Sequence, residues 1–453
     1  MSTVVYSSPF VPAEWIAAHG LRPLRLRPGA GAASVGPVMG MCPYARAFVG
    51  DVASAAAIVN PGRGGSPDPA GNAPAAGWHG HAPLRGHAPA ESGTHGHATS
   101  RGHVTRPLAS DPASGAAGRV ADSPWRETRR AQGAGCPPGV VINAVVLTTT
   151  CDQMRRAAEW LALGGGPPVF LMNVPATWQT PASARLYRDE LQRLGRFLVR
   201  LGGAAPSREH LADTMEAYDA RRAALRGALG ALGAREASEA IARFDAGEEA
   251  DDAALRDLVR GGSPDPPRSG ACEKDREHTY AAGQETRRAR LEGPSVPREG
   301  PQTRRAQAVP LALVGGPLAR EDVRVFDAIE RAGGRVVLDG TESGARTFPA
   351  PFDRRRLRDD PLLELGDAYF GAIPDIFRRP DTALYQWLGR ELAASAARGI
   401  VLWRNVWCDL WAAAGVRLRE ATGLPVLDLD VSGEEAGFNR TADRLQAFME
   451  MLK

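Results

Sequence analysis

The sequence predicts an α/β fold with two doubly wound, Rossmann-like parallel-sheet domains, a helical connector and two disordered inserts. Strand-like and helix-like segments alternate along most of the chain, which is typical of parallel sheets covered by helices. Residues 140–147 form a continuous apolar, β-branched run, as expected for a strand buried on both faces. With 453 residues, 43% of them apolar, the chain is long enough for two or three packed domains.

The elements expected in the first domain alternate between helix and strand. Its strands are short apolar runs at residues 140–147 and 169–172. The helix between them has apolar residues three and four positions apart, namely Met154, Ala157, Ala158 and Leu161. Two further helices are expected, at residues 45–52 and 181–201.

The C-terminal domain repeats this scheme, which predicts a second parallel sheet. Apolar runs predict four strands, at residues 310–314, 335–338, 399–403 and 425–429. Amphipathic segments between and after them predict helices at residues 320–332, around 361–372, and at 381–398, 409–422 and 439–452.

Composition sets the domain boundaries. Two segments rich in glycine and proline lack periodic apolar residues, so they cannot bury enough surface to offset the entropy of ordering. The first contains six of the nine histidines, and it is interpreted as a solvated linker or as a metal-binding tract. The expected order is a first α/β domain in two pieces (1–60 and 136–206) around the insert 61–135, a helical connector (207–261), the insert 262–308 and the C-terminal α/β domain (309–453).

Charge and patterning exclude several classes of protein. The net charge is only +3, and the basic residues, all but two of them arginines, are scattered, so we expect no nucleic-acid partner. No run of 18 apolar residues occurs, so we expect no membrane-spanning helix and no membrane partner. The N-terminal residues lack the features of a signal peptide, and the five cysteines lack a disulfide framework. We therefore expect a cytoplasmic protein.

Three of the cysteines stand where ligands of open α/β sheets bind. Cys151 and Cys408 each follow a predicted strand and open a helix, and Cys42 precedes another predicted helix. A helix N-terminus favours the thiolate form, which binds metal. Three thiolates are too few for a closed zinc site but suit a [4Fe–4S] cluster with one open iron. No local metal motif exists, so small buried apolar residues are an open alternative. Cys136 lies at the edge of the first insert and Cys272 within the second, so neither is expected to belong to the metal site.

A series of short segments, in order along the chain, carries a resemblance to a known family. The segments are 6–14 (YSSPFVPAE), 18–25 (AHGLRPLR), 150–156 (TCDQMRR), 173–175 (NVP), 314–318 (VGGPL), 329–337 (IERAGGRVV), 360–362 (DPL), 407–409 (WCD) and 441–450 (TADRLQAFME). In these segments the chain resembles the 2-hydroxyacyl-CoA dehydratase D-component family, which includes subunits of ATP-dependent benzoyl-CoA reductase.

The resemblance implies a cofactor, a reaction and partners. Cys42, Cys151 and Cys408 match the three ligands of a [4Fe–4S] cluster whose open iron faces substrate or water. An ATP-dependent iron–sulfur activator protein would supply one electron, and an acyl-CoA substrate would lose its hydroxyl group by a radical route. A second homologous subunit, or a second copy of this chain, is the expected partner. The alternatives are a benzoyl-CoA reductase-like or other small-substrate reductase subunit and a degenerate, non-catalytic partner subunit.

The resemblance also suggests roles for single residues, each with a structural alternative. Ser8 is expected to bind a thioester oxygen or to cap a helix near residue 12, and Glu14 to donate a proton or to occupy a helix surface. Arg346 is expected to pair with a CoA phosphate or to lie on the surface. Asp152 and Asp409 either favour their helix N-termini or orient amides toward a cluster.

Overall fold

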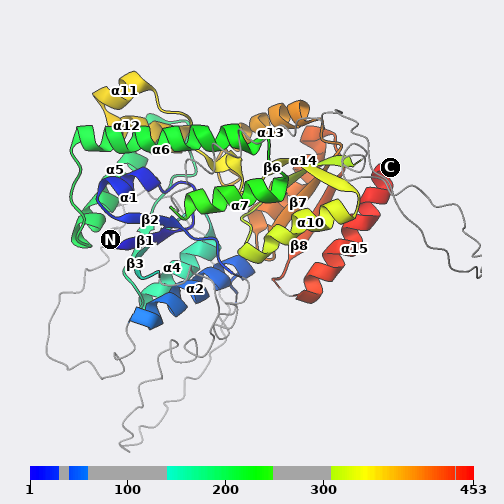
Figure 1. Ribbon diagram of the computed structural model, residues 1–453, viewed down its shortest axis with the longest axis horizontal. Helices are drawn as coiled ribbons and strands as arrows, with labels where there is room; N and C mark the ends of the chain where they lie inside the picture. Colours follow the sequence, from blue (N-terminus) through cyan, green and yellow to red (C-terminus); the bar gives the residue numbers. More distant parts are fainter. Residues whose placement is uncertain (30–39, 60–139, 248–307, 434) are drawn as a thin grey trace, which may run out of the picture. The chain divides into compact units, whose positions relative to one another are not determined.

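The computed structural model describes residues 1–29, 40–59, 140–247, 308–433 and 435–453 (Figure 1). These residues belong to one compact unit, Met1–Asn60 with Ser123–Lys453. They form two four-stranded, all-parallel sheets flanked by helices, which confirms the predicted α/β fold with two sheets. The predicted inserts, 61–135 and 262–308, lie outside the described residues except for position 308, as do Cys136 and Cys272.

The first sheet has the strand order β2-β1-β3-β4. Its strands are β1 (Thr3–Tyr6), β2 (Arg22–Arg25), β3 (Ile142–Thr148) and β4 (Val169–Met172). Successive side chains of a strand point to opposite faces of the sheet, so apolar residues on both faces need a covering layer. Helices supply that layer on both faces. On β1, Val4 and Tyr6 join the apolar core beneath α1 (Ala13–Ala18) and α5 (Pro181–Arg200). Val5 joins the opposite core beneath α2 (Pro43–Val59) and α4 (Asp152–Leu163).

The second sheet repeats this topology, with the order β6-β5-β7-β8. Its strands are β5 (Val309–Gly315), β6 (Gly334–Gly340), β7 (Gly399–Asn405) and β8 (Val426–Val431). On β5, Leu311 and Leu313 join one core and Ala312 and Val314 the other. The covering helices are α10 (Arg324–Arg331) and α15 (Glu435–Leu452) on the first of these faces and α13 (Thr382–Ser395) and α14 (Asp409–Thr422) on the second.

Two of the predicted helices of this domain are shorter than expected. The helix expected at residues 320–332 begins as the 3-10 turn η2 (Arg320–Val323), in which Asp322 accepts a hydrogen bond from the Ala319 amide at 2.9 Å. The helix expected around residues 361–372 is α12 (Pro361–Gly366) followed by the π-helical turn η4 (Asp367–Gly371). Two short elements precede it, η3 (Ala345–Thr347) and α11 (Arg354–Asp359).

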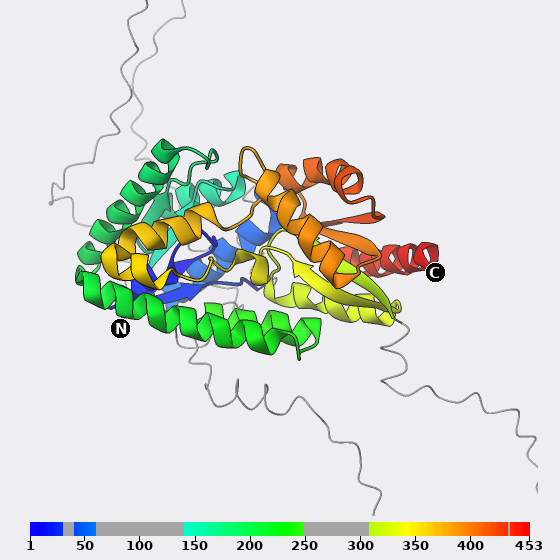
Figure 2. The ribbon, with the colours of Figure 1, turned by 90° about the horizontal axis from the view of Figure 1, so that it is seen from above.

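The predicted connector contains two helices, α6 (Arg208–Leu229) and α7 (Ala234–Asp245), and its residues 248–261 lie outside the described part (Figure 2). The hydroxyl of Ser207 caps α6 by accepting from the His210 amide at 3.1 Å. Helix α7 contacts β2 of the first sheet and β6 of the second. It therefore joins the two sheets along one side.

Within the described ranges, none of the helices is both long enough and apolar enough to cross a membrane.

Candidate functional site

The carboxyl ends of both sheets open into one cavity of about 80 Å³. In each sheet the connection after one central strand leads to one edge of the sheet, and the connection after the other central strand leads to the opposite edge. The crevice between two such connections is called a switch point, and open α/β sheets bind ligands there. The lining comes from segments that follow six different strands, with Cys42 and Tyr44 after β2. It includes Ser8 after β1, Thr148 and Cys151 at and after β3, Gly316 after β5, Glu342 after β6, and Cys408 after β7.

Cys42, Cys151 and Cys408 all line this cavity, and each is a free thiol. Cys151 and Cys408 are the N-cap residues of α4 and α14, and Cys42 directly precedes α2. The Cys42 amide donates to Gln153 Oε1 at 2.8 Å, which ties the start of α2 to the start of α4. The structure thus brings together the three cysteines that the sequence selected.

A strained turn sets the position of Cys408. The residue before it, Trp407, has a φ of 69°. A positive φ is uncommon for a bulky residue and indicates a backbone that the surrounding structure holds under strain. The Cys408 amide donates to the Asn405 carbonyl at 3.1 Å and closes the turn after β7. The Trp407 side chain is 64% exposed, so packing of that side chain does not explain the turn.

The pKa values of the three thiols differ from the sequence expectation. Burial raises the pKa of Cys42, that of Cys151 to about 12 and that of Cys408 to about 11. Backbone amides at the helix starts lower these pKa values, as the sequence predicted, but burial is the larger effect. The helix N-termini therefore favour the thiolate as expected, but burial outweighs them and leaves the net pKa of each thiol raised. A positive charge in the cavity would be needed to stabilise three thiolates.

The three thiols of the cavity are soft donors, the kind that hold an iron–sulfur cluster. Among the described residues, no group of three His, Cys, Asp or Glu side chains is arranged to hold one metal ion. A four-iron cluster is larger than an ion, so its thiolate ligands stand farther apart. Soft thiol donors select iron–sulfur clusters, copper(I) or zinc over magnesium or calcium.

Two carboxylates that the sequence analysis missed also line the cavity, Glu342 and Asp375. Burial and the neighbouring Asp375 raise the pKa of Glu342 to about 7. Arg25 Nη2 donates to the Glu342 carbonyl at 2.9 Å, and its Nε donates to the Ser7 carbonyl at 3.1 Å. Arg25 therefore links the loop after β1 of one sheet to the loop after β6 of the other.

Ser8 lies in the cavity lining, but it does not cap α1. Its Oγ accepts from the Phe10 amide at 3.3 Å and its carbonyl from the Val11 amide at 3.2 Å, so it caps a turn. The N-cap residue of α1 is Pro12, which supplies no side-chain hydrogen bond. The capping interpretation of Ser8 is therefore wrong, because both Ser8 oxygen atoms accept hydrogen bonds within the turn at residues 8–11, which precedes the helix.

Glu14 is fully buried and is not among the residues that line the cavity. It forms an ion pair with Arg222 of α6, and Tyr369 Oη donates to its Oε2 at 2.6 Å. The surface interpretation of Glu14 is wrong, because α1 packs against α6 on this side. Its role as a proton donor to substrate stays a prediction.

Arg346 is 3% exposed, so the surface interpretation is wrong here too. Its guanidinium donates to the Gly340 carbonyl at 3.0 Å and contacts Asp375 Oδ2 at 3.3 Å. These internal partners hold it behind the cavity lining, and its pairing with a CoA phosphate stays a prediction. Asp152 pairs with Arg155 at 3.2 Å on the surface of α4, in keeping with a first-turn acid.

Comparison with known proteins gives one family. The family model described as 2-hydroxyglutaryl-CoA dehydratase, D-component, matches residues 131–249 and 276–452. These ranges contain Cys151, Cys408 and Glu342, whereas Ser8 and Cys42 precede them. A search of curated proteins finds no match.

Proposed function

The chain belongs to the 2-hydroxyglutaryl-CoA dehydratase D-component family, whose model matches more than half of it, and on that premise we propose that it is the iron–sulfur subunit of a 2-hydroxyacyl-CoA dehydratase. One observation carries the proposal. Cys42, Cys151 and Cys408 come from distant parts of the chain and line a single cavity at the switch points of both sheets.

The three thiols would hold three irons of a [4Fe–4S] cluster and leave the fourth iron open to a substrate oxygen or to water. When bound, the cluster supplies a Lewis-acidic iron and a path for one electron at low potential. Cluster binding would release the thiol protons, which burial otherwise retains at neutral pH. The raised pKa values of the thiols therefore agree with ligands that lose their protons to a cation.

Two other lining residues would handle protons and oxygen atoms of the substrate. The Ser8 Oγ accepts from a backbone amide, so its own proton remains available for a thioester oxygen. Burial and the neighbouring Asp375 raise the pKa of the Glu342 carboxyl, which favours its protonated form, and that form can protonate the departing hydroxyl group. Asp375 is held by Arg346, so Glu342 is the better proton donor of the two.

In the proposed reaction the bond from carbon 2 to its hydroxyl oxygen breaks and carbon 3 loses a proton. Water and a 2-enoyl thioester result. The electron that activates the thioester is recovered at the end, so there is no net oxidation or reduction. The electron would come from an ATP-dependent iron–sulfur activator protein, and the working enzyme would pair this chain with a second homologous subunit or a second copy. The free thiols in the cavity agree with a reducing, cytoplasmic location.

Anaerobic reconstitution with iron and sulfide tests the proposal. We expect about four irons and four sulfides per chain, with an absorption band that air bleaches. Cys151→Ser should lower the iron content sharply, because a hydroxyl is a poor ligand at a soft site. Cys272→Ser removes a thiol from a predicted insert and should keep the iron. Equal iron loss in the two variants, or full retention in Cys151→Ser, would remove the cluster from the proposal.

A further inference from the structure

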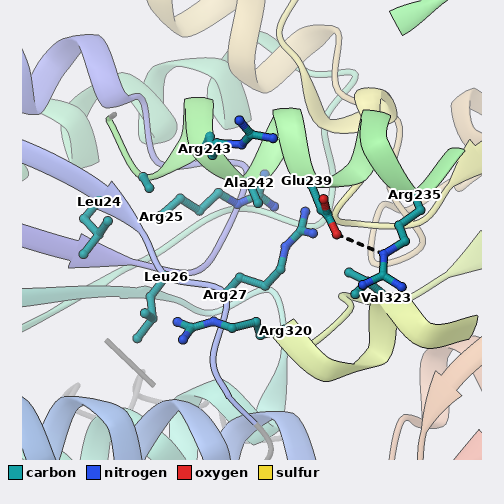
Figure 3. A pocket seen from close by; sticks show the side chains of 11 residues that line it. Leu24, Arg25, Leu26, Arg27, Arg235, Glu239, Ala242, Arg243, Arg320 and Val323 are labelled. Atoms are coloured by element: carbon teal, nitrogen blue, oxygen red, sulfur yellow. Dashed lines mark hydrogen bonds and ion pairs between the residues drawn. The ribbon is translucent and has the colours of Figure 1, made fainter. Parts of the chain in front are cut away.

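A second cavity, of about 540 Å³, is rich in arginine (Figure 3). Its lining comes from β2 and the residues after it, from α7, and from η2. We call it the arginine pocket, after its five arginines Arg25, Arg27, Arg235, Arg243 and Arg320. Among the described residues that line it, Glu239 is the only acidic one. Ligand pockets of proteins are roughly 300–1,000 Å³, so the space suits a sizeable ligand.

Part of this positive charge is balanced within the protein. Arg25 pairs with Asp245 at 3.3 Å. Arg235 pairs with Glu239 at 3.0 Å and also with Asp327. These two arginines are therefore fixed in place and contribute little net charge to the pocket.

Arg27 and Arg243 have no carboxylate partner among the described residues. Arg27 donates to Ser238 Oγ at 3.0 Å and to the carbonyls of Ser238 and Ser343 at 3.2 Å, all of them neutral acceptors. Burial lowers the pKa of Arg27, although the nearby carboxylates of Asp245 and Asp339 partly offset this effect without hydrogen bonding to Arg27. Arg243 is exposed on the last turn of α7. Arg243 thus offers the pocket a guanidinium that has no ion-pair partner among the described residues.

The arginine pocket lies next to the cysteine cavity. A small space of about 10 Å³ separates them, and its lining shares Arg25 and Arg27 with the arginine pocket. The same lining shares Tyr44 and Pro317 with the cysteine cavity. We call this space the neck. It has room for about one water, so a ligand passes only if the Tyr44 or Arg27 side chain moves aside.

We propose that the arginine pocket binds the phosphate groups of the CoA part of the thioester substrate, whose acyl end reaches the cysteine cavity through the neck. This assignment rests on the proposed function. Guanidinium groups bind phosphate with paired hydrogen bonds, and the guanidinium of Arg243 has no ion-pair partner among the described residues. A slender ligand with phosphates at one end and a thioester at the other matches two cavities joined by a narrow neck.

Binding measurements on the full chain, before cluster reconstitution, test the assignment. CoA, ADP and inorganic diphosphate are titrated separately and in competition. We expect CoA to bind, diphosphate to compete with it, and added salt to weaken both. Arg243→Gln should weaken CoA binding about fivefold, the effect of one exposed charge pair. Arg196→Gln is the matched control: it removes an exposed arginine on α5, outside the pocket, and should leave affinity unchanged.

The outcomes separate this assignment from the proposed function. Equal CoA affinity in the two variants would overturn the pocket as the phosphate site. Binding of ADP or diphosphate that depends on Arg243, without competition by CoA, would overturn CoA as the ligand. Iron content is measured in parallel and should not change in Arg243→Gln. Full iron without CoA binding overturns this assignment alone, whereas CoA binding that depends on Arg243 without iron supports the pocket and overturns the cluster.

Discussion

Cys151 and Cys408 hold the same position in the two sheets. Each is the N-cap residue of the helix that follows the third strand in the sheet order, α4 after β3 and α14 after β7. Both strands lie at a switch point, so both thiols reach the same cavity. The repeated topology therefore brings together two cysteines that are far apart in the sequence.

This relationship predicts that the two thiols serve one metal group. Cys151→Ser and Cys408→Ser should each lower the iron content sharply after reconstitution, and the double variant should lose little more. Residues that act as one unit show such non-additive losses. Iron and sulfide analysis of the three variants measures this. If each single variant lost about half of the iron and the double variant all of it, the thiols would belong to separate sites.

The sequence predicted best those elements whose own residues show a clear apolar pattern. Strand β4 and helix α14 have the expected bounds, and β5, β6 and β7 extend the expected runs by two or three residues. Strands β3 and β8 begin and end one or two residues later than expected. Strands β1 and β2 were not predicted, and β2 reads Arg-Pro-Leu-Arg, which is not an apolar run. Pairing with β1 and burial of Leu24 make β2 a strand, and neither is visible in its local pattern.

The site shows the same division between local and tertiary information. The cysteines were found because each opens a helix and has a distinctive local sequence. Glu342 and Asp375 were missed, because they come from loops whose only shared feature is the cavity they line. Glu14 was misjudged because α6, which buries it, is almost two hundred residues away in the sequence. A periodic pattern on α1 alone does not report such packing.

A glycine beneath the cavity gives a prediction about stability. Gly315 ends β5 with a φ of 149°, and a Cβ there would overlap the carbonyl oxygen of Trp403 on β7. Both backbones are fixed by strand pairing, so neither can move away. We expect Gly315→Ala to lower the free energy of unfolding by about 3 kcal/mol, through strain and overpacking. Denaturant unfolding measures the change.

The neighbouring residue is the control for this prediction. In Gly316→Ala the new Cβ would lie 3.7 Å from the Trp411 ring, an ordinary van der Waals distance. We expect this variant to change the free energy of unfolding by less than about 1 kcal/mol. Equal unfolding midpoints for the two variants would mean that the contact with Trp403 does not constrain this position.

The buried ion pair of Glu14 and Arg222 gives a second prediction about stability. Both side chains are at most 2% exposed, so Glu14→Ala would leave a buried, unpaired guanidinium. We expect a loss of about 3–5 kcal/mol in the free energy of unfolding. Asp152→Ala is the control, because it breaks an ion pair in which the Asp152 side chain is 84% exposed. That change should cost less than about 1 kcal/mol.

The variant Glu14→Gln separates the structural role of Glu14 from the proton-donor role. A glutamine keeps an acceptor for the Tyr369 hydroxyl but loses the charge that pairs with Arg222. An intermediate loss of stability is expected from a purely structural Glu14. Lost turnover with unchanged stability and iron content would instead support the proton-donor role.

A buried carboxyl in α2 predicts how stability depends on pH. The Asp51 side chain is buried, its Oδ2 accepts from the Gly29 amide at 3.0 Å, and its Oδ1 has no hydrogen-bond partner among the described residues. Burial raises the pKa of Asp51 to about 7, whereas an unfolded aspartate has a pKa near 3.9. Between about pH 4 and 7 the native state therefore holds a proton that the unfolded state has lost.

Since the native state binds the extra proton, the contribution of Asp51 to the free energy of unfolding falls as pH rises through this window, by at most about 1.4 kcal/mol per pH unit. Asp51→Asn removes this dependence and keeps an oxygen for the Gly29 amide. The stability of the variant relative to wild type should increase from pH 4 to 7 and then level off. Urea unfolding at several pH values measures this difference, with Asp213→Asn, an exposed position on α6, as the control for loss of one charge. If the difference between Asp51→Asn and wild type were independent of pH, Asp51 would not carry a proton in the native state.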